Sequence, residues 1–374
     1  MESPAKEIKK LSHWRKFVRF VFRFFSILSI SCYLLSYLSS HFNPSVFNVV
    51  SVLGLFFWPL LLLFLFAAAA MTFRKEWKWL IAFGICFVFS SPDLFSFFSF
   101  HFGGIKTSSS GIGMVLMTHN THLMGYYDGE SAKQNRDAIL NEIQTVKPNI
   151  LCLQECYWNT NGGDFLSEQS RNSILSGYAV HERTTHVLSD GGRFGLVIFS
   201  KYPVVNQGQV PFENEVNNFC IYIDVLVGSD TVRIYNAHLQ SFRLKKKSLQ
   251  LFDENIDMNE IQNESKPLLA QLYGASLKRS KQVDVLASHI ESCSHKVIVA
   301  GDFNDTPVSY TYNRLMRSLE DSFQDAGNGI GSTYRGPLLG LRIDYVLHSK
   351  GLVARSYLTS EAGASDHRPV IVTF

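Results

Sequence analysis

Five polar side chains fall at the ends of apolar, strand-like runs in the C-terminal two thirds of the sequence. They are Asn120, Glu155, His238, Asp302 and Asn304. Ligands bind beyond the carboxyl ends of strands in layered α/β folds, so we expect these groups to converge in one crevice. Carboxylate and amide oxygens without a His/Cys cluster favour a hard cation such as Mg²⁺ over zinc.

The segments that carry these groups alternate between strand and helix patterns. The expected strands are Met114–Met117, Asn149–Leu153, Leu196–Phe199, Phe219–Val227, Val232–Ala237, Val297–Ala300, Ile343–Leu347 and Val370–Thr373. The expected helices are Ala132–Val146, which Pro148 ends, and Leu268–Ile290, which follows a polar insertion from Ser241 to about Pro267. This interleaving predicts an α/β architecture rather than an all-β barrel.

Six motifs follow one another along this part of the chain. In order they are Asn120, Gln154-Glu155, Asn236-Ala237-His238-Leu239, Gly301-Asp302-Phe303-Asn304, Arg342-Ile343-Asp344-Tyr345 and Ser365-Asp366-His367-Arg368-Pro369. A single one of them could be a turn, but the ordered set resembles the endonuclease/exonuclease/phosphatase superfamily. That superfamily includes pancreatic-type deoxyribonucleases, apurinic endonucleases, inositol polyphosphate 5-phosphatases and neutral sphingomyelinases. The resemblance covers about residues 112–374 and implies a four-layer sandwich of two packed β-sheets flanked by helices.

The resemblance implies a metal site. Glu155 would be the main metal-ligating carboxylate, with Asn120 beside it, and Asp366 is positioned to serve the same metal. We expect Mg²⁺, with Mn²⁺ or Ca²⁺ as alternatives. A cation of this kind offsets the charge that develops on phosphoryl oxygens.

The resemblance also assigns the reacting groups. Asp302 would orient or deprotonate the attacking water, and Asn304 would help to hold the phosphate. His367 would lie at the scissile phosphate, with Asp344 fixing its tautomer and charge, and His238 would be the second histidine. An activated water and an imidazolium are what phosphodiester hydrolysis requires besides the cation.

Other polar residues fit a function less specifically. Arg193, in the Gly-rich stretch 190–195, is a candidate phosphate contact, although a hairpin with a solvated Arg explains the pattern equally well. Asn236 is a second candidate substrate contact that could instead close a strand. The sequence Lys245-Lys246-Lys247 could meet anionic lipid or nucleic acid, or form a solvated face. Histidines without motif context are assigned to the surface or the core: His119, His122, His181, His186, His289, His295 and His348.

The first 102 residues hold 20 of the 30 Phe residues and read as a membrane segment. Val46–Met71 runs for 26 residues without a charge, and a bilayer core needs only about 20. With weaker neighbours, the expected spans are about 20–40, 47–71 and 79–100. A signal peptide for the first and a re-entrant stretch for the third are the alternatives. We therefore divide the chain into a membrane segment at 1–104, a linker at 105–113 and a catalytic domain at 114–374.

The charges predict how this segment is oriented. Lys and Arg precede the first span and lie between the second and third, whereas the loop 41–45 has none. The positive-inside rule then places the N-terminus in the cytoplasm and, with three spans, the catalytic domain outside it. Two spans would reverse this. We expect an integral protein of the cytoplasmic (inner) membrane whose catalytic domain is extracytoplasmic.

Charge and cysteine content narrow the function classes. The first 104 residues hold 10 basic and 4 acidic residues, a net charge of +6, and the rest hold 25 and 28, a net of −3. The catalytic part therefore lacks the basic balance typical of nucleic-acid binding. Cys32 and Cys86 lie in the spans. Four cysteines of the catalytic part could be buried thiols or, outside the cytoplasm, form a disulfide: Cys152, Cys156, Cys220 and Cys293.

The sequence thus predicts a membrane-anchored, divalent-metal-dependent phosphoester hydrolase, either a phosphodiesterase or a phosphatase. The favoured substrate is a lipid headgroup or another small extracytoplasmic phosphoester, and the lipid bilayer is the expected partner. One alternative is a membrane-tethered endonuclease acting on DNA or RNA. The other is a non-catalytic membrane protein whose hydrolase-like domain only binds a partner.

Overall fold

The computed structural model describes residues 4–101, 113–213, 218–242, 258–336, 340–361 and 364–374. The chain divides into two compact units. The first comprises Met1–Phe95 with Val308–Tyr310, and the second comprises Ser96–Pro307 with Thr311–Phe374.

The first unit is built from apolar helices. They are α1 (Pro4–Leu38), α2 (Asn48–Leu53), the 3-10 turn η1 (Gly54–Phe56), α3 (Phe57–Phe73) and α4 (Trp77–Phe97). Three stretches are long and apolar enough to cross a membrane: His13–Leu38, Val50–Phe73 and Trp77–Phe97. The prediction of three N-terminal apolar helices is therefore confirmed, with boundaries shifted by a few residues.

Several buried or charged side chains within this unit have polar partners. The Tyr33 ring is fully buried and stacks on Phe64 with 4.3 Å between the centroids, and its hydroxyl lies 2.5 Å from Ser90 Oγ. Ser40 Oγ donates to Asp93 Oδ2 at 2.5 Å. Glu76 accepts from Arg23 Nη2 at 2.9 Å. Because an unpaired charge in apolar surroundings is costly, these partners make the two acids tolerable in this unit.

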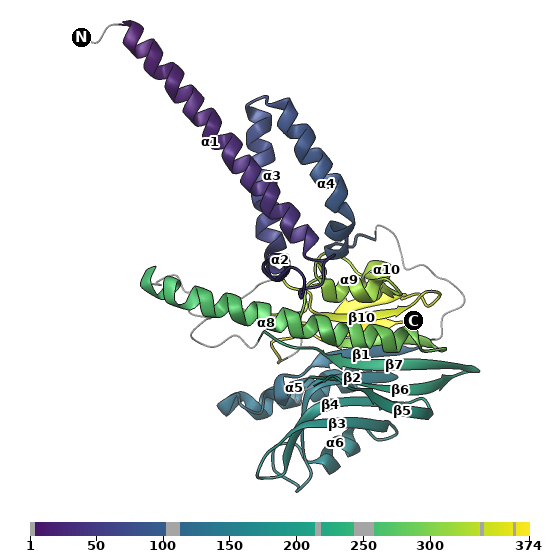
Figure 1. Ribbon diagram of the computed structural model, residues 1–374. Helices are drawn as coiled ribbons and strands as arrows, with labels where there is room; N and C mark the ends of the chain where they lie inside the picture. The colour runs from purple at the N-terminus through teal and green to yellow at the C-terminus, as the bar shows by residue number, and fades with distance from the viewer. Residues whose placement is uncertain (1–3, 102–112, 214–217, 243–257, 337–339, 362–363) are drawn as a thin grey trace. The chain divides into compact units, whose positions relative to one another are not determined.

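The second unit contains two six-stranded mixed sheets (Figure 1). The first has the order β11-β12-β1-β2-β4-β3, from Ser356–Thr359, Val370–Thr373, Val115–Asn120, Ile150–Asn159, Gly192–Ser200 and Ala179–Val187. The second has the order β5-β6-β7-β8-β10-β9, from Val204–Val210, Phe219–Val227, Asp230–His238, Lys296–Asp302, Asp344–Ser349 and Leu319–Asp321. The pairs β1/β2 and β7/β8 are parallel, and the others are antiparallel.

Helices cover the outer faces of both sheets. In α5 (Ala132–Val146), Ile139 and Ile143 repeat at helical spacing and share a buried cluster with Phe199 of the first sheet. In α8 (Met258–Glu291), the His289 ring lies against Tyr222 and Tyr235 of the second sheet. Shorter helical pieces complete the unit: η2 (His122–Gly125), η3 (Gly129–Ser131), α6 (Glu168–Ile174), α9 (Tyr310–Met316) and α10 (Ser322–Ala326).

A second buried cluster fills the space between the sheets. It joins Leu116 and Ile198 of the first sheet to Ile234, Ile298 and Val346 of the second. The fold is therefore the predicted pair of packed sheets flanked by helices. Three cysteines are buried: Cys152, Cys156 and Cys220. All six cysteines are free thiols. Burial raises the pKa of the Cys156 thiol to about 12, so it is unreactive at neutral pH.

Several predicted boundaries are wrong. The α8 helix begins at Met258, so Pro267 lies inside the helix instead of preceding it, because one proline removes a single N–H donor and bends a helix without always ending it. Strand β1 runs on to Asn120, and β2 continues through Glu155 to Asn159. The strands β3, β5, β9 and β11 were not predicted. Lys245–Lys247 and most of the predicted linker lie outside the described residues.

A buried guanidinium anchors the start of β10. Arg342 is fully buried, and its Nη1 donates to Asp321 Oδ2 at 2.7 Å while Nη2 donates to the Ser96 carbonyl at 2.8 Å. The guanidinium carbon also lies over the Phe323 ring, 4.5 Å from its centroid. Because Arg342 precedes Asp344 by two residues, this ion pair fixes the backbone that carries Asp344.

We expect Arg342→Met to destabilise the second unit by about 3–5 kcal/mol, the cost of leaving a buried carboxylate without its partner. Hydrogen exchange of β8 and β10 peptides in the full chain, read by mass spectrometry, measures this loss. Adding Asp321→Asn should restore at least about half of it, because asparagine removes the unpaired charge. Unchanged protection in Arg342→Met would show that the pair does not hold β10.

Candidate active site

Strand register brings three of the predicted residues into one row. In the parallel pair β7/β8, His238 lies opposite Asp302. In the antiparallel pair β8/β10, Asp302 lies opposite Asp344. The row therefore crosses three adjacent strands at the level where β7 and β8 end and β10 begins. In the other sheet, Asn120 ends β1 opposite Gln154 of β2.

Gly301 allows the strands of this row to approach one another. Its φ is +140°, and a Cβ at this position would overlap the Ala237 carbonyl oxygen of β7. Only glycine fits where two backbones come this close. The glycine before Asp302 is thus explained by the packing of β8 against β7.

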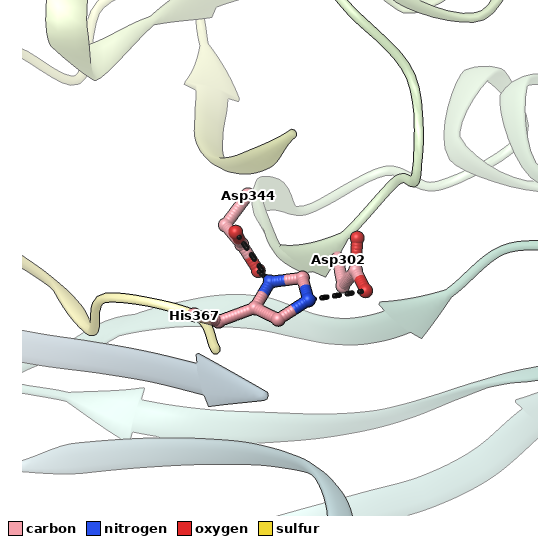
Figure 2. A group of neighbouring side chains, drawn as sticks. All are labelled: Asp302, Asp344 and His367. Carbon is pink, nitrogen blue, oxygen red and sulfur yellow. Dashed lines mark hydrogen bonds and ion pairs between the residues drawn. The ribbon is translucent and has the colours of Figure 1, made fainter. Parts of the chain in front are cut away.

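His367 joins the row from the loop before β12, and Figure 2 shows it between the two aspartates. Its Nδ1 lies 2.9 Å from Asp344 Oδ2 and 3.2 Å from Asp344 Oδ1. Its Nε2 lies 3.9 Å from Asp302 Oδ2, which is an ion-pair distance but too long for a hydrogen bond. All three side chains are buried, with 1–5% of their surface exposed.

Burial and charge act against each other in this row. Burial alone would lower the pKa of His367, but Asp344 and Asp302 outweigh it and raise the pKa to about 10. Burial raises the pKa of Asp302 to about 6, although His367 opposes the rise. At neutral pH the row therefore holds an imidazolium beside a carboxylate whose pKa lies close to neutrality.

Amide groups complete the surroundings of Asp302. Asn304 has a left-handed φ of +53°, donates its backbone N–H to Asp302 Oδ1 at 2.8 Å, and donates Nδ2 to Oδ2 at 3.0 Å. Asn120 Nδ2 also donates to Oδ2, at 3.0 Å, from the first sheet. The two asparagines predicted to serve the phosphate and the metal thus both contact the predicted base.

Glu155 reaches the same region through a β-bulge. The register of β2 shifts between Leu153 and Cys156, and Glu155 has a left-handed φ of +48°. Bulges of this kind turn a side chain away from its regular direction. Glu155 Oε1 lies 3.6 Å from His238 Nε2, which is also 3.7 Å from Asp302 Oδ2. That Nε2 is buried and makes no hydrogen bond with the described residues.

The donor set fits a divalent cation. Ligand atoms of Asp302, Asp344 and His367 lie within 4.8 Å of one another, and while His367 is protonated the two carboxylates are what this group offers a cation. The Glu155 carboxylate is about one third exposed and accepts no hydrogen bond in the described part of the chain, so its oxygens are free for an ion. Asp366 Oδ1 lies 3.5 Å from His122 Nδ1 and accepts from Ser365 Oγ at 3.3 Å. The ligand roles of Asn120, Glu155 and Asp366 stay predictions.

His119 contacts the site, although its sequence context predicts only a surface or core position. It is buried, and its Nε2 lies 3.2 Å from the backbone carbonyl oxygen of His367. Burial lowers its pKa to about 4, so the ring is neutral and donates Nε2–H to that carbonyl. Ser365 Oγ donates to the Asn120 carbonyl at 2.8 Å and accepts from the His367 N–H at 3.1 Å. These bonds attach the His367 loop to β1.

Asn236 and Arg193 do not join this group. Asn236 is fully buried and donates Nδ2 to the Leu153 and Val197 carbonyls at 2.9 and 3.0 Å, while Oδ1 accepts from Gln154 at 2.6 Å. These hydrogen bonds connect the two sheets, and the substrate contact of Asn236 stays a prediction. Arg193 lies on β4, paired with Trp158 and Val187, and its phosphate contact remains a prediction.

Comparisons with known proteins agree with this geometry. Residues 117–367 match the model of the endonuclease/exonuclease/phosphatase family. Residues 18–97 match a family described only as a domain of unknown function. No curated protein matches the chain.

Two solved structures share the fold. An endonuclease/exonuclease/phosphatase from Beutenbergia cavernae is 21% identical with a TM-score of 0.50, covering 70% of each chain. The human nocturnin catalytic domain, solved with a bound sulfate anion, is 18% identical with a TM-score of 0.50, covering 71% of this chain and 94% of nocturnin's. Enzymes of the family are phosphoester hydrolases that typically depend on a divalent metal. Since the family match spans more than half of its residues, this chain belongs to the endonuclease/exonuclease/phosphatase family.

Proposed function

We propose that this protein is a membrane-anchored, divalent-metal-dependent phosphoester hydrolase acting on a lipid headgroup or another extracytoplasmic phosphoester. The buried row of Asp344, His367 and Asp302 is the observation that carries the proposal. It sets an imidazolium and a carboxylate side by side, which suits an acceptor for a proton of water and a donor to a phosphoryl oxygen.

Each residue of the row has a separate task in this proposal. Asp302, fixed by the amides of Asn120 and Asn304, takes a proton from the attacking water. His367 directs Nε2–H at a phosphoryl oxygen, because Nδ1–H is held by Asp344. His238, whose Nε2 has no hydrogen-bond partner among the described residues, is available to a second phosphoryl oxygen. A bound divalent cation would supply charge stabilisation at the phosphoryl group.

Two features support a membrane-associated, small substrate. Three N-terminal helices are long and apolar enough to cross a bilayer. The catalytic part carries a net charge of −3, so the excess of basic residues typical of nucleic-acid-binding domains is absent.

Asp344→Asn should move the pH–rate profile toward acid. Asp344 raises the pKa of both His367 and Asp302, so its neutral replacement lowers both values. The alkaline limb, where His367 loses its proton, and the acid limb, where Asp302 gains one near pH 6, should both shift to lower pH. Rates measured from pH 4 to 11 test this, and an unmoved alkaline limb would exclude His367 as the proton donor.

The substrate class is tested with purified full-length protein in detergent, with and without Mg²⁺. We expect phosphoester cleavage in mixed phospholipid micelles or of small phosphodiesters, lost with chelator and restored by Mg²⁺. Asp302→Ala and His367→Ala should each lower kcat by at least about 10³-fold, the range of losses for groups acting in the reaction itself.

Matched controls are Asp230→Ala and His295→Ala, which remove the same side-chain types from exposed positions. Both should keep normal rates. Rapid cleavage of DNA or RNA with no activity on lipids or small esters would favour the endonuclease alternative. Normal rates in Asp302→Ala or His367→Ala would mean that the site is misassigned.

The sidedness is tested by topology reporters in living cells. With three spans, alkaline phosphatase fused after Phe374 should be active, and green fluorescent protein fused there should be dark, as expected outside the cytoplasm. A fluorescent fusion would place the catalytic domain in the cytoplasm, and would bring cytoplasmic nucleic acids within its reach.

A further inference from the structure

A cleft opens beside Glu155 and His238, within the second unit. Its other side is formed by Leu123, Thr185, His186 and Phe194. The cavity volume is about 180 Å³, below the roughly 300–1,000 Å³ typical of sites that hold drug-sized ligands. The cleft therefore suits a small group, such as a single ring, esterified to a phosphoryl group held beside His238 and Asp302.

Two β-bulges at the same level build the two sides of this cleft. Gly195 of β4 pairs with Cys156 of β2 and with Thr184 of β3. The pairing register of β2 with β4 shifts just before Cys156, and that of β3 with β4 shifts just after Thr184. A Cβ on Gly195 would overlap the Arg183 carbonyl oxygen, so this position requires glycine. One bulge presents Glu155 and the other presents Thr185 and His186 to the same cleft.

The side formed by β3 and β4 combines aromatic faces with neutral polar groups. The His186 ring lies nearly parallel to the Phe194 ring, at 21° and 6.2 Å between centroids. The rings of Tyr126 and Tyr157 also pack against the Phe194 ring, with 6.0 and 5.4 Å between the ring centroids. Thr185 Oγ1 donates to the Phe194 carbonyl at 3.1 Å and keeps its lone pairs for an incoming hydroxyl. His186 is exposed and forms no hydrogen bond with another described residue.

The composition of the cleft excludes several ligand classes. Among the described residues that line it there is no Lys or Arg, so a second phosphate or a nucleic-acid backbone would find no counter-charge. Histidine, threonine, asparagine and serine interrupt the apolar surface, which disfavours an acyl chain. A ring with hydroxyl groups complements both the aromatic and the polar side chains of the cleft. Its C–H bonds pack on an aromatic face, while its hydroxyls bind the polar groups.

We propose that this cleft is a subsite for a neutral, hydroxyl-bearing ring, a sugar or a cyclitol, esterified to the phosphoryl group, and that His186 determines this specificity. The proposal rests on the proposed function for the position of the phosphoryl group. The hydrogen bonds of the ring to His186 and Thr185 distinguish it from an apolar ring of the same size.

Direct binding to the full-length protein in detergent with Mg²⁺ tests the subsite by calorimetry. The probes are α-glucose 1-phosphate, cyclohexyl phosphate, adenosine 5′-monophosphate and inorganic phosphate. We expect glucose 1-phosphate to bind about tenfold more tightly than cyclohexyl phosphate, the effect of one or two neutral hydrogen bonds. Tighter or equal binding of cyclohexyl phosphate or of the adenosine phosphate, or no binding of any probe, would overturn the proposal.

The variant His186→Ala should reduce the preference for glucose 1-phosphate over cyclohexyl phosphate to about threefold or less. His186→Phe keeps a flat ring without its nitrogens and should lose the same preference. Val187→Ala is the matched control on β3, because its side chain is exposed and lies outside the cleft lining. A full preference in His186→Ala would show that His186 does not select the ring.

A parallel turnover assay with the same esters separates the subsite from the proposed function. Preferential binding of glucose 1-phosphate without hydrolysis of any ester would retain the subsite and reject the hydrolase. Hydrolysis of cyclohexyl phosphate and glucose 1-phosphate at equal kcat/KM would retain the hydrolase and reject the subsite. Glucose attached to a phospholipid in vesicles, compared with the free sugar phosphate, then shows whether the ring is delivered from the membrane or from solution.

Discussion

The burial of three ionisable side chains in one row is the constraint on which the rest of the catalytic unit depends. Asp302, His367 and Asp344 are almost removed from water, where an unpaired charge costs several kcal/mol. Their mutual ion pairs offset part of that cost, and amide donors from Asn120 and Asn304 satisfy the remaining carboxylate oxygens. Because every group must be paired, the row tolerates only one arrangement of the surrounding strands and loops.

This requirement explains why the site lies where the two sheets meet. Asp302 and Asp344 come from the second sheet, while Asn120 comes from β1 of the first and His367 from the loop before β12. Hydrogen bonds of Asn236 to β2 and β4 hold the sheets in register below the row. The donors are therefore fixed before a substrate arrives, and such preorganised groups stabilise developing charge without reorganisation. His119 also contributes to this preorganisation, because its neutral ring donates a hydrogen bond to the backbone carbonyl of His367.

Much of this arrangement could be predicted from residue types at strand ends. His238, Asp302 and Asp344 follow or begin apolar runs, and strand pairing alone then aligns them. Strands β3 and β5 could not be predicted in this way, because their exposed faces are polar and leave no continuous apolar run. The contact of His119 could not be predicted either, since a loop 248 residues later in the chain supplies its acceptor. The hydrogen bonds of Asn236 between the sheets could not be predicted, because a buried amide and a substrate-binding amide look the same in a sequence.

The catalytic aspartates lie on central strands, whereas part of the cleft lies on an edge strand, and this difference matters for substrate specificity. Asp302 and Asp344 lie on β8 and β10, each with a neighbouring strand on both sides, so a substitution at either one disturbs several paired groups. The side of the cleft that carries Thr185 and His186 lies on β3, which is the edge of its sheet. An exposed side chain on an edge strand has few neighbours, and its replacement costs little stability. Selectivity can therefore change at β3 while the buried charges that perform the reaction stay in place.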